Sequence, residues 1–238
     1  MPNTVAIFGD SISKGIVYEN KKLLKLKDSM VNIVAEEYGL DVINYSKYGQ
    51  TLKKLTERKA VEKYLSEVGQ KGDYAIFCIG GNDADFDWAS VAETPFEDHL
   101  PATPVSEFEK LLSANIKLLK DAGVNVIITT IPPVDSQRYF KEVISKIADG
   151  DKVLDFFAGD VTNISRHQEC YNLALVKCAA KCGCMLIDLR TGFLLDRKYL
   201  RNYCEDGIHP NEQGHRFMAE EVIRSLEEQG LVLKKKNA

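Results

Sequence analysis

The chain has 238 residues, a formal net charge of −4 and a sequence pI near 5.7. Such values are typical of a soluble globular protein with a substantial core, and they do not favour nucleic acid or an anionic membrane surface as a partner. The N-terminus lacks a basic region followed by an apolar run, and no stretch approaches the ~20 apolar residues of a membrane span, so we expect a cytoplasmic protein.

Five apolar runs of strand length recur along the chain, with helical patterns between them. They cover 4–8, 41–45, 74–80, 125–131 and 184–189. The runs are near-continuous rather than alternating, which is typical of strands buried on both faces. Alternation of strand and helix favours right-handed crossovers. The sequence therefore predicts a single α/β domain over 1–238, with helices on both faces of a doubly wound, five-stranded parallel sheet.

The helical patterns have recognisable ends. The first two, 22–39 and 51–69, stop at a glycine. The third, 104–123, opens with Pro104 and a capping box formed by Ser106 and Glu109. The last helix is expected to follow "HPNEQG" and to run to about Gln229.

Two segments, 82–104 and 132–165, are longer than ordinary strand–helix connections. Each follows the carboxyl end of a predicted strand, which is the edge where open α/β sheets bind ligands. We interpret them as insertions that form a lid or determine specificity. Surface decoration is the alternative.

Six cysteines are present, four of them between 170 and 184, but their spacing is not that of a zinc site. We interpret them as small buried thiols in a reducing compartment. No metal or other cofactor is expected. The cysteines are Cys78, Cys170, Cys178, Cys182, Cys184 and Cys204.

Four short polar blocks stand at the ends of these elements. "GDS" ends the first strand at Ser11, Gly49 follows the second, "GGND" with Asn82 follows the third, and "DGIH" with Asp206 and His209 precedes the last helix. If the strands are parallel, all four blocks lie at one edge of the sheet. Each alone could be a turn or a helix cap; the ordered set is much more specific.

In this order the set resembles the SGNH hydrolases, or GDSL esterases, whose name records Ser, Gly, Asn and His in four blocks. Ser11, Gly49, Asn82 and His209 match them along nearly the whole chain, with Ile12 in place of the leucine of "GDSL". The resemblance implies a flavodoxin-like α/β/α sandwich and ester hydrolysis.

The chemistry accounts for each position. A serine hydroxyl needs a base within hydrogen-bond reach, so His209 would take the proton of Ser11 and return it to the leaving alcohol. Asp206 would hold the other ring nitrogen. The backbone N–H groups of Ser11 and Gly49 and the amide of Asn82 would stabilise the oxyanion.

The remaining polar residues have lesser parts. We expect Asp10 to brace the turn through backbone hydrogen bonds, and a metal-dependent phosphohydrolase built on it would lack further ligands. His99, His167 and His215 are expected to be surface or structural residues.

Substrate contacts are expected from the insertions. An aromatic ring beside carboxylates suits a sugar, and Trp88 follows Asp83 and Asp85 in the first insertion, although it could instead pack the lid against the body. Arg138, just past the fourth strand, is a further candidate. We therefore predict a serine esterase that removes small acyl groups, most simply acetyl, from a small molecule or oligosaccharide. A lipase, lysophospholipase or thioesterase is the alternative, and a non-catalytic flavodoxin-like binding module is a remote one.

Overall fold

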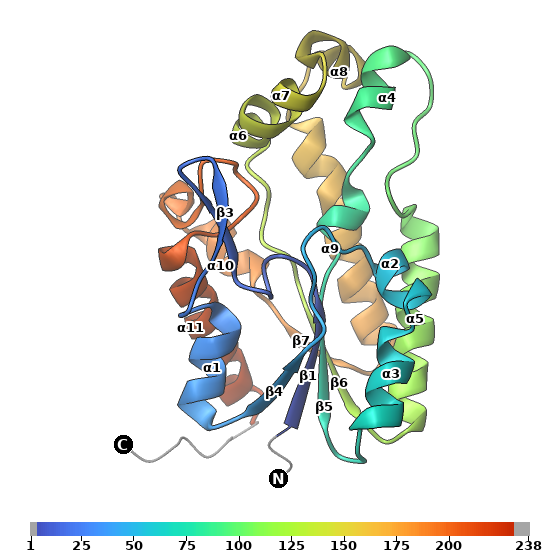
Figure 1. Ribbon diagram of the computed structural model, residues 1–238, viewed down its shortest axis with the longest axis vertical. Helices are drawn as coiled ribbons and strands as arrows, with labels where there is room; N and C mark the ends of the chain where they lie inside the picture. The colour runs from blue at the N-terminus through green and yellow to red at the C-terminus, as the bar shows by residue number, and fades with distance from the viewer. Residues whose placement is uncertain (1–3, 231–238) are drawn as a thin grey trace.

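The computed structural model describes residues 4–230 and consists of a parallel sheet between two layers of helices (Figure 1). The sheet order is β4–β1–β5–β6–β7, and every pairing is parallel. By position along the chain this is the order 2-1-3-4-5 of flavodoxin-like folds, so the predicted fold class is confirmed. The strands are β1 (Thr4–Gly9), β4 (Asp41–Asn44), β5 (Tyr74–Cys78), β6 (Asn125–Thr129) and β7 (Met185–Ile187).

Strand β1 shows why the apolar runs do not alternate. Its even positions, Ala6 and Phe8, pack into the core on one face of the sheet, and its odd positions, Val5 and Ile7, pack into the core on the other. One face is covered by α2 (Leu52–Glu57), α3 (Ala60–Glu67), α5 (Val105–Asp121) and α9 (Asn163–Cys182). The other is covered by α1 (Met30–Tyr38), α10 (Arg190–Leu195) and α11 (Glu212–Glu228).

The first predicted helix is wrong over its first half. Residues 16–25 form an antiparallel hairpin of β2 (Ile16–Glu19) and β3 (Lys22–Lys25), joined by Asn20 and Lys21. Both turn residues have positive φ, at 50° and 59°, as a two-residue hairpin turn of the primed type requires. The helix itself begins only at Met30, where the side chain of Ser29 accepts the N–H of Asn32.

Two further expectations about helices are wrong in detail. The predicted helix 51–69 is two helices, α2 and α3, because Lys59 adopts a left-handed conformation between them. In α5 the capping residue is Pro104, with no side-chain cap, so Ser106 lies within the first turn and the capping box is absent. The last helix ends at Glu228, as expected.

The two insertions form a helical cap beyond the carboxyl ends of the strands, at the top of Figure 1. The first contains η1 (Asn82–Ala84) and α4 (Trp88–Glu93). The second contains α6 (Ser136–Tyr139), η2 (Phe140–Ile144), α7 (Ser145–Ile147) and α8 (Gly150–Phe156). They share a third hydrophobic cluster that is separate from the two cores beside the sheet. We call this part of the molecule the cap.

The cysteine expectation holds only in part. Cys78, Cys178 and Cys204 are buried, but Cys170 is exposed on α9 and Cys182 and Cys184 are half-buried. All six thiols are free.

Candidate active site

Ser11 lies at the carboxyl edge of the sheet, in a tight turn that follows β1. The carboxylate of Asp10 accepts the N–H of Ile12 at 2.9 Å, which confirms its predicted bracing part. Gly9 leaves no room for a side chain: a Cβ there would lie 1.9 Å from Ser13 Oγ and 2.7 Å from the carbonyl oxygen of Cys78. The close approach of β5 therefore fixes where the turn places Ser11.

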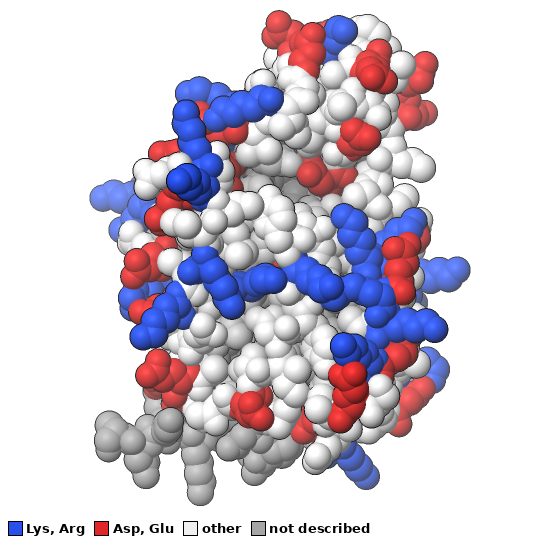
Figure 2. Space-filling view, viewed as in Figure 1, with Lys and Arg blue, Asp and Glu red and all other residues white. Residues whose placement is uncertain are grey.

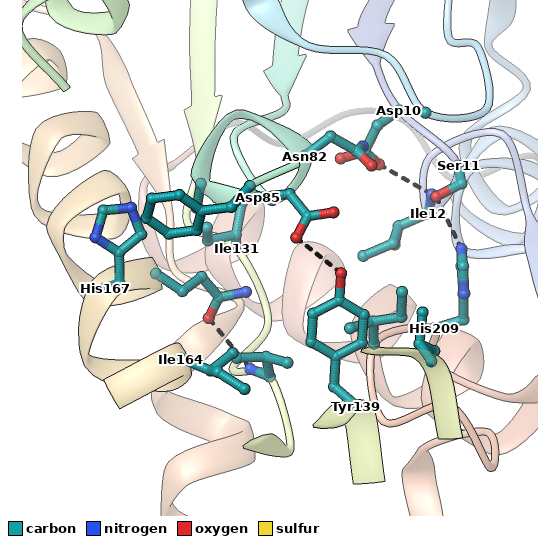
Figure 3. Close-up of a pocket in the computed structure, with 18 of the residues that line it drawn as sticks. Asp10, Ser11, Ile12, Asn82, Asp85, Ile131, Tyr139, Ile164, His167 and His209 are labelled. Carbon is teal, nitrogen blue, oxygen red and sulfur yellow. Dashed lines mark hydrogen bonds between the residues drawn. The ribbon is translucent and has the colours of Figure 1, made fainter. Parts of the chain in front are cut away.

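The serine, histidine and aspartate that the sequence singled out form one chain of hydrogen bonds. Figure 3 shows the bond between Ser11 and His209. Ser11 Oγ lies 2.9 Å from His209 Nε2, and His209 Nδ1 lies 2.6 Å from Asp206 Oδ2. The other oxygen of Asp206 accepts the N–H groups of Ile208 and His209 at 3.2 and 3.1 Å. All three triad-like side chains are buried, so solvent does not compete for these bonds.

Tyr48 is a neighbour of the histidine that the sequence reasoning missed. Its ring stacks nearly parallel to that of His209, with centroids 6.3 Å apart and an interplanar angle of 13°. Tyr48 is 57% exposed, so it covers the imidazole from the solvent side. The sequence feature that could have indicated Tyr48 is its position directly before Gly49, the glycine of the second polar block.

The three residues expected to supply the oxyanion donors, Ser11, Gly49 and Asn82, all line one cavity. The candidate donors are the N–H groups of Ser11 and Gly49 and the side-chain amide of Asn82. Within residues 4–230 neither N–H has a hydrogen-bond acceptor. Gly49 has a φ of 61°, a conformation that glycine adopts without strain. The Asn82 amide is held by donating to the carbonyl oxygen of Gln50 at 3.2 Å.

A cavity of about 220 Å³ extends from Ser11 beneath the cap. In Figure 3, Ser11 and His209 lie at one end, Ile164 and His167 lie at the other, and Tyr139 lies between them. Most of its wall is aliphatic or aromatic. The apolar lining comprises Ile12, Ala84, Phe86, Trp88, Ile131, Pro132, Val134, Val143, Ile147, Phe157, Ile164 and Ile208.

Asp85 and Trp88, two of the predicted substrate residues, lie on this wall. Both are joined to Tyr139 of the second insertion. The Tyr139 hydroxyl donates to Asp85 Oδ1 at 2.8 Å, and Trp88 Nε1 lies 3.4 Å from the same hydroxyl. Burial raises the pKa of Asp85, and burial together with Asp85 raises that of Tyr139.

Asp83 and Arg138, the other two predicted substrate residues, lie outside the lining of the cavity. Asp83 is fully buried and accepts the N–H of Leu52 with both oxygens, at 2.9 and 3.0 Å. Arg138 turns away and donates to the carbonyl oxygens of Leu200 and Cys204.

His167, expected to be a surface or structural residue, instead forms part of the cavity wall, where its ring centroid lies 4.9 Å from that of Phe86.

Burial perturbs two carboxyl groups near the site. Burial raises the pKa of Asp10 to about 6. The hydrogen bond from Ile12 and the nearby His209 lower that pKa, but their effect is smaller. Burial raises the pKa of Asp83 to about 7, against hydrogen bonds that favour its charged form. Burial also lowers the pKa of His167, which therefore stays neutral at pH 7.

Across residues 4–230, no three His, Cys, Asp or Glu side chains are grouped so that they could hold a metal ion. In that same range no helix has both the length and the apolar character needed to cross a membrane.

Comparison with solved structures shows the same fold in several hydrolases. A lipase/acylhydrolase from Enterococcus faecalis is 20% identical, with a TM-score of 0.67 over 99% of both chains. The psychrotrophic esterase EstA from Pseudoalteromonas sp. is 16% identical, with a TM-score of 0.61 over 96% of this chain and 99% of that one. The acetyl xylan esterase AlAXEase is 20% identical, with a TM-score of 0.64 over 94% of this chain and 99% of that one.

A search of curated protein sequences gave no match. The model of the GDSL-like lipase/acylhydrolase family matches residues 7–217, which include all four polar blocks. The chain therefore belongs to the GDSL-like lipase/acylhydrolase family, the SGNH hydrolases, and is a serine hydrolase that acts on esters.

Proposed function

We propose that the protein hydrolyses carboxylic esters of small acids and alcohols through an acyl-enzyme on Ser11. The observation that carries this proposal is the hydrogen-bonded succession from Ser11 through His209 to Asp206. His209 Nε2 accepts the hydroxyl proton as Ser11 Oγ forms a bond to the ester carbonyl carbon. The proton then passes to the leaving alcohol as the ester C–O bond breaks. Water, activated by the same ring, completes the cycle by hydrolysing the acyl-serine bond.

The oxyanion of each tetrahedral intermediate would receive hydrogen bonds from the N–H groups of Ser11 and Gly49 and from Asn82 Nδ2. Both N–H groups lack other acceptors in the described chain, so they are available without breaking an existing bond. Asp206 would keep the proton of the neutral ring on Nδ1, which leaves Nε2 free to act as the base.

The size of the cavity supports a small substrate. A cavity of about 150 Å³ holds one benzene ring, so 220 Å³ accommodates roughly nine non-hydrogen atoms. A long acyl chain would have to leave the cavity and lie on the surface. The lipase, lysophospholipase and thioesterase alternatives are therefore less well supported than hydrolysis of short or medium esters.

Deacetylation of a carbohydrate is the second candidate, and Asp85 favours it, because a carboxylate in the cavity could accept hydrogen bonds from sugar hydroxyls. One of the structurally similar proteins is an acetyl xylan esterase. Stacking on Trp88 does not add support, since its ring is 4% exposed and packs against Phe86, Phe157 and Tyr139.

A series of p-nitrophenyl esters from two to sixteen acyl carbons, together with acetylated xylo-oligosaccharides, tests this proposal. We expect kcat/KM to fall once the acyl group exceeds about nine carbons. Val143→Phe narrows the cavity from a half-buried position and should move the optimum to shorter chains. Val68→Phe, at an exposed site away from the cavity, is the matched control. A preference of the wild-type protein for sixteen carbons would contradict the proposal.

A further inference from the structure

The cavity beside Ser11 contains a carboxylate that no cation of the described part of the chain balances. Asp85 receives a hydrogen bond from the neutral Tyr139 hydroxyl, and within residues 4–230 it forms no ion pair. Among the described residues that line the cavity there is no Lys or Arg, and the other carboxylate, Asp10, has the same sign. Charges inside proteins are normally paired, so an unbalanced carboxylate on a substrate-sized cavity indicates that the partner is supplied by the ligand.

The rings around Asp85 suit a cation as well. Trp88 lies 5.4 Å from Phe86, 5.8 Å from Phe157 and 6.4 Å from Tyr139, measured between ring centroids. All four residues line the cavity. The Phe86 ring is half-buried and is the most accessible of them, whereas Trp88 is 4% exposed and packs against the other three rings. The faces of aromatic rings attract ammonium groups, most strongly when water is excluded, and such groups of rings recognise quaternary ammonium ions.

The negative charge of the cap also favours a cationic ligand. Segment 82–104 has six acidic residues and no Lys or Arg, while 132–165 has six acidic and four basic residues. The two insertions thus carry a formal charge of −8, whereas the whole chain carries −4. Figure 2 shows acidic side chains gathered over the cap and a band of basic side chains across the body below it. A cation approaching the cavity therefore meets an attractive field.

We propose that the cavity binds a quaternary ammonium group, placed against Asp85 and the surrounding aromatic rings, and that the preferred esters carry this group. A trimethylammonioethyl group has six non-hydrogen atoms and fits within the roughly nine that the cavity holds. The inference rests on the proposed function, because it takes Ser11, at one end of the same cavity, as the residue that attacks the ester.

Two pairs of isosteric esters test this inference, because the members of each pair differ only in a nitrogen or a carbon. Choline acetate is compared with 3,3-dimethylbutyl acetate, which places the cation on the alcohol. Ethyl 4-(trimethylammonio)butanoate is compared with ethyl 5,5-dimethylhexanoate, which places it on the acyl group. In at least one pair we expect kcat/KM for the cationic ester to be tenfold to about thirtyfold higher, as one desolvated cation–aromatic contact would give.

Two variants separate local contact from the general field. Asp85→Asn should reduce the preference for the cationic ester to less than threefold. Asp98→Asn removes a formal charge from the same insertion, but at an exposed position outside the cavity, where salt screens it. It should leave the preference unchanged. Thermal unfolding of both variants checks that the fold is retained.

The outcomes distinguish the two proposals. If the neutral esters are hydrolysed and neither pair shows a preference for the cation, the ammonium inference is wrong and the esterase proposal stands. The inference is also overturned if Asp85→Asn slows both members of a pair equally, because the carboxylate would then act as a structural hydrogen-bond acceptor. Failure of the folded protein to hydrolyse any of the four esters would instead count against the proposed function.

Discussion

Replacing Asp206 by Asn should move the ring proton of His209 from one nitrogen to the other while leaving the loop nearly intact. Asp206 accepts three hydrogen bonds, two from backbone N–H groups through Oδ1 and one from His209 Nδ1 through Oδ2. An asparagine oxygen can still accept both backbone bonds. The amide nitrogen, however, would donate to Nδ1 at the place of Oδ2 and so move the ring proton to Nε2. That nitrogen lies 2.9 Å from Ser11 Oγ and could then no longer accept its proton.

We expect Asp206→Asn to lower kcat by about 10⁴, which corresponds to about 5 kcal/mol of transition-state stabilisation. Because the backbone bonds are kept, the melting temperature should fall by only a few degrees. The assay is the initial rate on p-nitrophenyl acetate, with thermal unfolding measured in parallel.

Asp188→Asn is the matched control. Asp188 also accepts the backbone N–H groups two and three residues further along, those of Arg190 and Thr191, but it does not contact His209. The initial rate of the Asp188→Asn protein on p-nitrophenyl acetate should match that of the wild type. A loss of less than tenfold in a folded Asp206→Asn protein would refute the idea that Asp206 orients the histidine.

Three other predictions concern the oxyanion donors, the turn and the buried acid. Asn82→Ala removes a side-chain donor, so kcat should fall by roughly a hundred- to a thousandfold with little change in KM. Steady-state kinetics measures both constants, and a loss of kcat below tenfold would contradict a role of Asn82 as an oxyanion donor. Gly9→Ala places a Cβ 1.9 Å from Ser13 Oγ, and overpacking should cost about 1–3 kcal/mol in the free energy of unfolding, measured with urea; an unchanged midpoint would contradict it. The pKa of Asp83 is about 7 in the folded protein against 3.8 for the free side chain, so the folded state binds more protons between these values. The free energy of unfolding should therefore decrease as pH rises from 4 to 7, by up to about 4 kcal/mol from this group, and Asp83→Asn should flatten that slope; equal slopes in the two proteins would be inconsistent with the raised pKa.

The sheet and the meeting of the four blocks could be predicted because they depend on local pattern and topology. Strands buried on both faces produce continuous apolar runs, and parallel strands bring their carboxyl ends to one edge. Ser11 and His209 are 198 residues apart in the chain, yet both follow from that rule. Ser11 comes shortly after a strand and His209 shortly before a helix, and these positions bring both residues to the same edge of the sheet.

Features set by packing between distant segments could not be predicted in the same way. The "KLLK" stretch fits a helix as well as a strand, and only the turn at Asn20 and Lys21 makes it part of a hairpin. Trp88 is buried because α4 packs against α8 and Tyr139, more than fifty residues later. His167 reaches the cavity for a similar reason, since α9 returns beside the first insertion.

The most direct test of the account is covalent labelling of the nucleophile. A fluorophosphonate probe should add once to the folded protein, and peptide mapping by mass spectrometry should locate the adduct on Ser11. Ser11→Ala should fold normally, take up no label and lose ester hydrolysis. Absence of an adduct on the active wild-type protein, or ester hydrolysis that survives in Ser11→Ala, would contradict the central claim that Ser11 is the nucleophile.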